Sequence, residues 1–582
     1  MPSCCSSEEP EQANLHFIAS PSPLSADRRL FLGCIALRAG WLPAPTETWP
    51  SSFVRPALTT QWRSPPQCCA IWRRSTSPAL SRNTPPHRTI APATLGDMSS
   101  PSSPSSKPLI NLLRGWPSTS LLPASLLKRA ADTALTTPSI AHPGLLYGPD
   151  PGHPNLRKSV AAWLTDFYHP QQPVRDDRIC ISGGASQNLG CLLQVFTDPI
   201  YTRAIWISSP AYMLAFRIFD DAGFHAKLRS VPQDDAGMDV DFLRREIEKT
   251  DDQEHRGDRE LPPMLKPKRP WSKFYRHVIY VVPNHSNPSS VSMSLERRQQ
   301  LVRLARDFDC LVICDDVYDF LQWPAAKAEG RGHPDPRRCS LPRIVDIDRF
   351  LDGGAEGPGR DGFGNVASNG SFSKICGPGL RTGWLEGTRK LAHGVSQAGT
   401  TRSGGAPSQL TSTYVSLLLE WGELQQHVYG TLQPALAARY RTMVSAIERH
   451  LVPVGVTFAR PPGREVAGGY FVWLSLPAPL TGVEVARIAR EEQNLIVAEG
   501  QMFEVPGDSA RIKFPRDVRV CFAWEPEDML EQGIQRLGQV IQEVQRRGQR
   551  VAEGGSSDGI QRETDEEGRK ENGDSQGGAN YW

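Results

Sequence analysis

The stretch SFSKICGPGLRTGW, residues 371–384, places Lys374 directly after two serines and Arg381 seven positions further on. Lysine forms Schiff bases where its pKa is lowered, because the neutral amine is the nucleophile. Serine hydroxyls and a guanidinium beside that lysine suit a bound phosphate. An amine for an aldehyde, together with donors for a phosphate, predicts pyridoxal 5′-phosphate attached to Lys374. The alternative for this stretch alone is a solvated loop beside a strand, so features elsewhere in the chain are needed to choose between the two.

The composition is that of a globular protein with several domains. A chain of 582 residues is too long for one compact core, and 39% of its residues are hydrophobic. The formal net charge of +2 gives no indication of nucleic acid or an acidic membrane surface as a partner. The 12 cysteines show no C-x-x-C pair and no zinc-ligand spacing, which predicts reduced thiols and no metal site. No apolar run approaches the length of a membrane span, so the chain is predicted to be cytoplasmic and free of membrane partners.

Two terminal segments lack the periodicity of helices and strands. Residues 1–106 are rich in Pro, Ser and Arg and predict a disordered extension, and residues 549–582, Gly-rich and charged, predict a disordered tail. Few acidic residues occur between Asn14 and Leu95, which partly matches a mitochondrial transit segment and makes a mitochondrial location the alternative. The prolines of this region argue against the amphipathic helix that such a segment needs. Met98, just before the first organised sequence, is a second candidate for the true start.

Between these segments, short apolar runs alternate with helical patterns, which predicts an α/β fold with a mostly parallel sheet between helices. We expect an N-terminal segment (107–150), a large domain (151–405), and an interdomain helix with a small α+β domain (406–548). Two polar stretches of the large domain, 249–273 and 325–369, are predicted to be surface loops. The runs taken as strands of the large domain are 178–182, 204–208, 277–282 and 310–314.

Polar residues follow these runs at the strand ends where an open parallel sheet binds ligands. Ala185 and Ser186 follow two glycines at the start of a helical pattern, so free N–H groups and the helix dipole can hold a phosphate there. An ordinary strand-to-helix turn is the alternative. Tyr212 can stack on a planar ring or only form a packed wall. Asn287 precedes a proline in a turn, where its amide is either structural or a donor to a phenolate oxygen.

Asp315 comes directly after an apolar strand, and a carboxylate is costly to bury there unless it is paired. A pyridinium nitrogen would be a suitable partner, and Tyr318 could reach the other side of the same ring. The alternative makes Asp315 the N-cap of a following helix, a role that Asp316 could also play.

The Ser-x-Ser-Lys segment with its arginine, the Asp-x-x-Tyr at 315–318 and the Asn-Pro turn at 287–288 occur in an order that resembles one known family. The chain resembles the class I and II aminotransferases of fold type I, near the aminoadipate/kynurenine aminotransferase branch, over roughly residues 108–548. The resemblance implies a large domain with a mostly parallel, seven-stranded-type sheet between helices and a smaller α+β domain. It also implies a homodimer with shared active sites, in which segment 107–150 packs on the small domain and on the partner subunit.

The resemblance implies a role for each of the singled-out residues. Lys374 would carry the cofactor and move a proton at the substrate α-carbon, while Asp315 would pair with the pyridine nitrogen. Asn287 and Tyr318 would hydrogen-bond the phenolic oxygen, and Tyr212 would stack on the ring. The phosphate would lie on Ala185, Ser186, Ser371, Ser373 and Arg381, together with Tyr147 from the neighbouring subunit.

Substrate binding is assigned by the same resemblance. Arg519 lies in the apolar run 518–522 and would clamp the α-carboxylate together with Asn287, the alternative being a surface charge on an edge strand. The pocket for the side chain would involve Gly115 and its neighbours. One departure from the family pattern is Ser290, which stands where a glycine usually completes the turn.

The sequence therefore predicts a pyridoxal-phosphate aminotransferase that acts on an L-α-amino acid and a 2-oxo acid. Aminoadipate, aromatic amino acids and kynurenine all remain open as donors, since no second arginine can be assigned to a distal carboxylate. A carbon–sulfur lyase or an aminocyclopropane-carboxylate-synthase-like enzyme would need the same cofactor residues. A non-catalytic regulator that uses the fold to bind an effector would need a winged helix-turn-helix domain, for which residues 1–106 are too rich in proline.

Overall fold

The computed structural model of the chain describes residues 107–255, 264–325, 334–405, 407–459, 465–508 and 512–554. The predicted disordered extension 1–106, including Met98, lies outside these residues, as does the tail from residue 555 onward.

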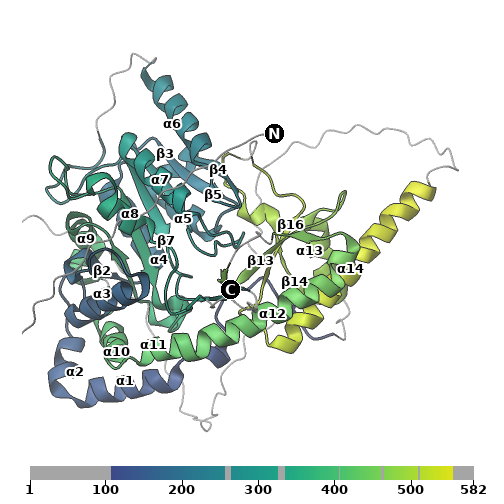
Figure 1. Ribbon diagram of the computed structural model, residues 1–582, viewed down its shortest axis with the longest axis horizontal. Coiled ribbons are helices and arrows are strands. Elements are labelled where there is room, and N and C mark those ends of the chain that lie inside the picture. Colours follow the sequence, from purple (N-terminus) through teal and green to yellow (C-terminus); the bar gives the residue numbers. More distant parts are fainter. Residues whose placement is uncertain are drawn as a thin grey trace, which may run out of the picture. The chain divides into compact units, whose positions relative to one another are not determined.

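A sheet of eight strands forms the centre of the larger part of this structure (Figure 1). Seven strands were expected, and the eighth is a two-residue edge strand, β5. Only β10 and β5 run antiparallel to their neighbours, so the sheet is mostly parallel, as predicted. In spatial order the strands are β2 (Ile179–Ser182), β10 (Gly383–Glu386), β9 (Val366–Ser371), β7 (Cys310–Asp315), β6 (His277–Val281), β3 (Ala204–Ser209), β4 (Leu228–Asp234) and β5 (Gly237–Met238).

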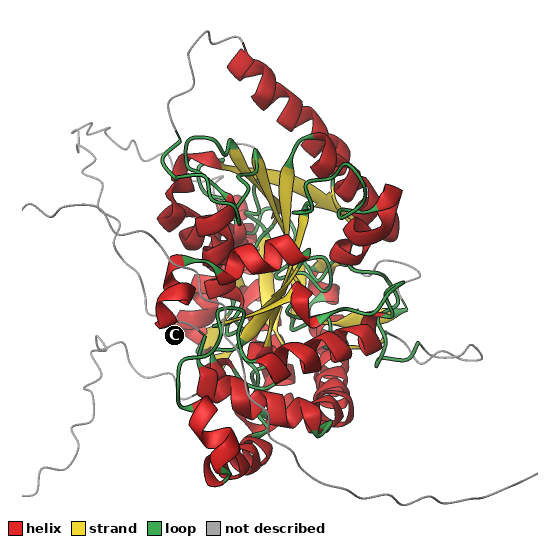
Figure 2. Ribbon diagram, turned by 90° about the vertical axis from the view of Figure 1, so that its left-hand side faces the viewer, coloured by secondary structure: helices red, strands yellow, loops and turns green. Residues whose placement is uncertain are grey.

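Both faces of this sheet are covered, because successive residues of its strands point to opposite sides. In β7, Leu311 and Ile313 belong to one buried cluster, whereas Val312 and Cys314 belong to another. In Figure 2 the strands lie between helices on either side. The first cluster is covered by α4 (Ala185–Phe196), α5 (Leu214–Phe219) and α9 (Arg389–Ser396), and the second by α6 (Val240–His255), α7 (Leu295–Asp307) and α8 (Ile344–Phe350).

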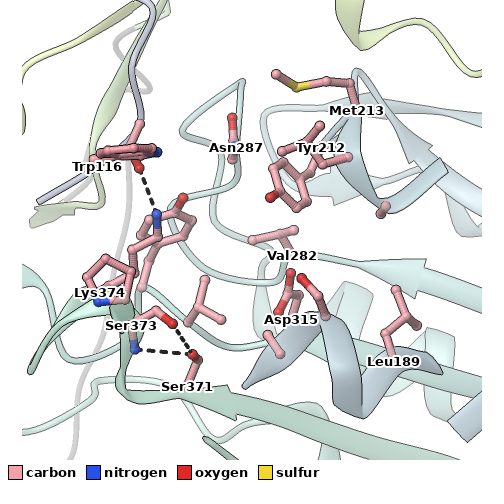
Figure 3. Close-up of a pocket in the computed structure, with 18 of the residues that line it drawn as sticks. Trp116, Leu189, Tyr212, Met213, Val282, Asn287, Asp315, Ser371, Ser373 and Lys374 are labelled. Carbon is pink, nitrogen blue, oxygen red and sulfur yellow. Dashed lines mark hydrogen bonds between the residues drawn. The ribbon is translucent and has the colours of Figure 1, made fainter. Parts of the chain in front are cut away.

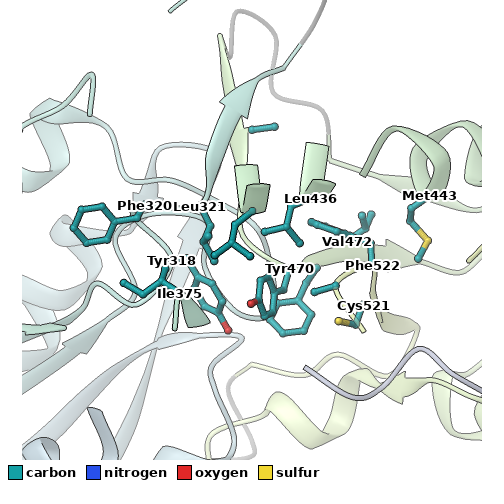
Figure 4. Packing of buried hydrophobic residues seen from close by; sticks show 14 of the residues in the cluster. Tyr318, Phe320, Leu321, Ile375, Leu436, Met443, Tyr470, Val472, Cys521 and Phe522 are labelled. Carbon is teal, nitrogen blue, oxygen red and sulfur yellow. The ribbon is translucent and has the colours of Figure 1, made fainter. Parts of the chain in front are cut away.

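A smaller antiparallel sheet of four strands lies on the other side of the cavity described below. One apolar cluster joins the two parts, with Tyr318 and Ile375 of the larger part packed near Tyr470 and Phe522 of the smaller one (Figure 4). Its sheet has the order β11 (Thr457–Phe458), β13 (Phe471–Ser475), β16 (Asp517–Cys521) and β15 (Ala498–Glu499), with α12 (Gln433–His450), α13 (Gly482–Gln493) and α14 (Glu527–Gly554) as its helices.

Two short strand pairs connect distant segments of the chain. β1 (Ile110–Asn111) pairs with β14 (Leu495–Ile496), which fixes the N-terminal segment to the smaller part, and β8 (Gln322–Pro324) pairs with β12 (Val466–Gly468). No helix in the described part of the chain is long and apolar enough to cross a membrane. The remaining α-helices are α1 (Ala124–Thr136), α2 (Pro138–Gly144), α3 (Pro154–Tyr168), α10 (Gln409–Glu420) and α11 (Glu423–His427).

The prediction that 249–273 and 325–369 are surface loops is wrong in part. Helix α6 continues to residue 255, and the Lys266 amine is held by three backbone carbonyls of the segment 193–197. The second stretch contains the buried helix α8 and the start of β9. This stretch is polar overall, so the short apolar run that forms the buried face of α8 is not apparent from its composition. Residues 256–263 and 326–333 lie outside the described part.

The boundary predicted for the C-terminal tail is also too early. Helix α14 continues to Gly554, past the predicted start of the tail at residue 549, whereas the buried apolar residues that keep its helical period end at Val544.

A buried cluster of charges fixes α8 to the larger sheet. Arg343 is 1% exposed and donates to both oxygens of Asp346 at 2.9 and 3.0 Å, and to Glu386 of β10 at 2.6 Å. Its guanidinium lies 4.1 Å from the ring of Tyr168. Burial alone would make each of these charges costly, so the cluster is stable only while it is complete.

We predict that Arg343→Leu lowers the free energy of unfolding by about 3–5 kcal/mol, because two buried carboxylates would lose their cation. Urea unfolding followed by circular dichroism measures this loss. Arg337→Leu is the matched control, since Arg337 pairs with Asp335 at the exposed surface and its loss should barely move the unfolding midpoint. Equal midpoints for the two variants would contradict the role given to the buried cluster.

Candidate active site

The carboxyl ends of β2, β3, β6, β7 and β9 open into one cavity of about 390 Å³ (Figure 3). The smaller sheet closes the opposite side with Phe471 and Arg519. This edge is where an open parallel sheet binds its ligands.

The structure brings all but one of the predicted site residues together around this cavity. The exception is Tyr147, which is 86% exposed and lines a separate groove with His142 and Gln409. Its prediction as a phosphate ligand of a partner subunit therefore stays a prediction. The predicted residues that line the cavity are Gly115, Ala185, Ser186, Tyr212, Asn287, Asp315, Tyr318, Ser371, Ser373, Lys374, Arg381 and Arg519.

Lys374 follows β9 and extends its amine into the cavity. Its Nζ donates to the carbonyl of Gly115 at 2.7 Å and lies 5.9 and 5.2 Å from the ring centres of Tyr318 and Tyr470. Although part of the side chain is accessible from the cavity, removal of the amine from bulk water lowers the pKa of Lys374 to about 8. The neutral, nucleophilic amine is therefore well populated near pH 8.

Asp315 ends β7 and is buried at the floor of the cavity. Its carboxylate accepts from the Tyr280 hydroxyl at 2.8 Å and from the Asn369 amide at 3.4 Å. Burial raises the pKa of Asp315 to about 6, against the opposing effects of the Tyr280 hydrogen bond and of Lys374. The residues directly after β7 form a turn and then β8, and no helix begins at residues 316–324, so the N-cap alternative is wrong. Asp316 points to the other side of the strand and is hydrogen-bonded by Ser368.

A cluster of donors surrounds the N-terminus of α4. Gly184 precedes this helix without a side-chain cap and has a φ of 100°, which leaves the first N–H groups open to the cavity. A Cβ at Gly184 would lie 2.7 Å from Nη2 of Arg381. Arg381 donates to Ser373 Oγ at 3.3 Å, and the hydroxyl of Ser373 lies 3.0 Å from that of Ser371. A guanidinium, two hydroxyls and a helix N-terminus therefore meet where an anion would bind.

Arg519 projects from β16 toward the same cavity. Its Nη1 donates to Asn287 Oδ1 at 2.8 Å and its Nη2 donates to the carbonyl of Leu113. The guanidinium lies between the rings of Phe471 and Phe503, 4.1 and 4.9 Å from their centres, and burial lowers the pKa of Arg519 to about 10. β16 lies between β13 and β15, so the edge-strand alternative is wrong.

Gly115 lines the cavity, and Ser290 belongs to the turn that follows Asn287. A Cβ at Gly115 would lie only 2.8 Å from the ring of Phe471, so glycine is needed for this close approach. Ser290 adopts a φ of 60°, the left-handed conformation that its family counterpart, a glycine, adopts at low cost. The Ser290 hydroxyl donates to the carbonyl of Phe471, which offsets this cost and keeps the turn in place.

Sequence reasoning missed three residues of the site. Tyr280 orients Asp315, and Asn369 does the same from the strand on the other side, directly opposite Asp315. The Tyr470 hydroxyl donates to the backbone carbonyl of Lys374 at 3.1 Å. A tyrosine and an asparagine in strands that are otherwise apolar or small were the available signals.

These groups fit pyridoxal 5′-phosphate. The cavity holds an amine with a lowered pKa, a buried carboxylate with a raised pKa and no salt bridge to a cation of the described chain, and a cluster of phosphate donors. A protonated ring nitrogen is a partner that would stabilise the ionised form of Asp315.

A family model described as Aminotransferase class I and II matches residues 109–537. The uncharacterized protein YER152C of Saccharomyces cerevisiae is 32% identical over 450 residues, which cover 74% of this chain and 96% of the relative. Aromatic-amino-acid aminotransferase 1 of Thermococcus litoralis is 26% identical over 75% of this chain and 88% of its own length. The crystal structure of a multiple substrate aminotransferase from Thermococcus profundus matches with a TM-score of 0.60 and 25% identity, over 75% of this chain and 92% of that one.

We predict that cofactor capture by Lys374 depends on pH with a midpoint near pH 8. Below this value the neutral fraction of the amine falls about tenfold per pH unit, and above it the rate levels off. The measurement is the initial rate at which cofactor-free protein gains the absorbance of lysine-bound pyridoxal phosphate between pH 6 and 10. Asp315→Asn should move the midpoint to lower pH, because Asp315 raises the pKa of Lys374. A rate that still rises steeply above pH 9.5 would contradict the lowered pKa.

Proposed function

This chain belongs to the class I and II aminotransferase family, and we propose that it transfers the amino group of an L-α-amino acid to a 2-oxo acid. Membership of this family makes the chain a pyridoxal-phosphate-dependent transaminase. The observation that supports the reaction best is the cavity itself, where the Lys374 amine, the Asp315 carboxylate and the Arg519 guanidinium face one space.

When bound, pyridoxal phosphate supplies an aldehyde that links to amines and a ring that withdraws electrons from the substrate α-carbon. Asp315 keeps the ring nitrogen protonated, held in place by Tyr280 and Asn369. Asn287 uses its Oδ1 to accept from Arg519, so its amide nitrogen is the group that donates to the phenolic oxygen, together with Tyr318. Tyr212 would stack on the ring. Ser371, Ser373 and Arg381 would bind the phosphate with the backbone and side chain at Ala185 and Ser186, since all of these residues line the cavity.

Lys374 performs the proton transfers. With the cofactor bound, its amine would take the proton from the substrate α-carbon as a general base and would give a proton back as a general acid. A pKa near 8 lets the same nitrogen act as base and as acid at neutral pH. Arg519 holds the substrate α-carboxylate, which directs the α-hydrogen toward Lys374.

The donor is an amino acid with a large side chain, with aminoadipate, aromatic amino acids and kynurenine as the candidates. Leu113, Trp116, Met213, Ile218 and Met502 give the cavity an apolar wall of the size such donors need. The name of the Thermococcus litoralis relative is consistent with an aromatic donor.

The protein acts as a homodimer in which Tyr147 reaches the phosphate of the neighbouring subunit. Leu145, Leu146 and Tyr147 are 63%, 69% and 86% exposed. An exposed apolar run of this kind is typical of a surface that a partner subunit covers. Co-expression of Tyr147→Ala with Lys374→Ala tests this arrangement. If Tyr147 acts across the interface, mixed dimers contain one intact site and regain activity, whereas absence of any recovery would contradict it.

The amino-transfer reaction itself is tested by adding L-amino acids, without any oxo acid, to cofactor-loaded protein. We predict that the absorbance of lysine-bound cofactor is replaced by that of its amino form, with one 2-oxo acid released per cofactor. Lys374→Ala should show neither the starting absorbance nor the change, whereas Lys390→Ala, a surface lysine that donates to the Asp361 carbonyl, should behave as wild type. Catalytic release of ammonia with an unchanged cofactor would instead establish a lyase.

A further inference from the structure

Three arginines line the cavity, and the third has no part in the reaction described above. Arg381 belongs to the phosphate cluster and Arg519 to the α-carboxylate. The remaining one, Arg114, lies in the segment that follows β1, where Asn111 Oδ1 accepts from the backbone N–H groups of Leu113 and Arg114 at 3.1 and 3.0 Å. This turn directs the chain from the smaller part into the cavity.

Two tryptophans hold the Arg114 guanidinium. Its central carbon lies 4.7 Å from the ring centre of Trp116 and 5.0 Å from that of Trp524, and the two indole rings meet edge to face at 5.8 Å. Flat indole faces attract a guanidinium and restrict its motion, while its N–H edge stays available for hydrogen bonds.

Arg114 has no acidic partner among the described residues. Its Nε is buried and finds no hydrogen-bond acceptor in this part of the chain. The carboxylate of Glu525, the residue after Trp524, instead accepts from the backbone N–H of Asn111 at 2.8 Å. A half-buried guanidinium with an unused donor is costly unless a ligand supplies the acceptor.

Arg519 shows the same arrangement on the other side of Leu113. It also lies between two aromatic rings, lacks an acidic partner in the described chain and has a buried Nε without an acceptor. Its Nη2 donates to the Leu113 carbonyl, so the two arginines flank one short segment of backbone. The cavity therefore presents two similar cationic sites beyond the phosphate cluster.

We infer that Arg114 binds the distal carboxylate of a 2-amino or 2-oxo dicarboxylic acid whose α-carboxylate lies on Arg519. This inference rests on the proposed amino transfer and names the substrate class that the sequence left open. From the sequence no second arginine could be assigned to a distal carboxylate, because Arg114 lies far from most of the other site residues in the chain and meets Trp524 only in the fold.

The inference predicts that a ligand which places a neutral group on Arg114 binds more weakly than one which places a carboxylate there. A neutral side chain that covers Arg114 would take its N–H groups from water without giving them a charged acceptor, which weakens binding. A carboxylate restores those hydrogen bonds in paired geometry. An amide of the same shape offers only one oxygen and no charge, so it is the sharpest comparison.

The experiment compares L-glutamate with L-glutamine as amino donors, since in glutamine an amide replaces the distal carboxylate. For wild type we expect kcat/KM to favour the dicarboxylate by about 10- to 100-fold, and Arg114→Gln should remove most of that preference. Arg114→Lys keeps the positive charge but loses the planar guanidinium that forms paired hydrogen bonds with a carboxylate. It should therefore retain an intermediate preference for the dicarboxylate. Arg129→Gln is the matched control, because Arg129 also lies over a tryptophan, Trp421, but is paired with Glu423 outside the cavity.

Calorimetry of the holoenzyme with glutarate and glutaramate, which cannot react, gives a second readout that does not depend on turnover. Wild type and Arg129→Gln should bind glutarate more tightly than the amide, and Arg114→Gln should bind the two alike. If Arg114 only joins Trp116 to Trp524, Arg114→Gln should lower the affinity for both ligands by the same factor. That result would overturn the inference.

The two measurements also separate this inference from the proposed function. Amino transfer with an unchanged preference in Arg114→Gln would overturn the role of Arg114 alone. Absence of amino transfer from every amino acid would overturn the proposed function, while the calorimetric preference would still decide whether Arg114 recognises a carboxylate.

Discussion

The burial of the Asp315 carboxylate at the end of β7, held by hydrogen bonds from neutral groups, is the constraint on which the cavity depends. An unpaired carboxylate in such a position costs several kcal/mol, and the pKa of about 6 reflects that cost. Tyr280 and Asn369 come from β6 and β9, the strands on either side of β7. A register shift of one residue would turn Asp315 to the opposite face of the sheet, so the strand order and register determine where the cofactor ring can bind.

The opposite wall of the cavity is a short backbone segment that both parts of the structure hold. Arg519 of the smaller sheet donates to the Leu113 carbonyl, and Lys374 of the larger sheet donates to the Gly115 carbonyl. Arg114 lies between these two anchors. The same three consecutive residues thus contact the arginine that we propose for the α-carboxylate and the lysine that we propose for proton transfer, and they include the arginine to which we assign the distal carboxylate.

The sequence predicted most of the fold and most of the residues that line the cavity, because the α/β alternation and the strand-end polar residues follow local rules. Asp315 could be found because its charge follows an apolar run, and Lys374 because two serines and Arg381 accompany it in one short segment. Arg343 and the helix α8 were missed, since their charged residues resemble exposed ones in sequence, and one partner of Arg343, Glu386, lies 43 residues away. Tyr280 and Arg114 were missed for a related reason: their partners come from other strands or loops and no local spacing reveals them.

The central claim is that Lys374 is the residue to which the cofactor is attached. Borohydride reduction of the loaded protein makes such a link permanent, and digestion followed by mass spectrometry then locates it. The account predicts the added cofactor mass on the peptide that contains Lys374 and on no other lysine peptide. Cofactor on a different lysine, or a reduced protein without any added mass, would contradict it.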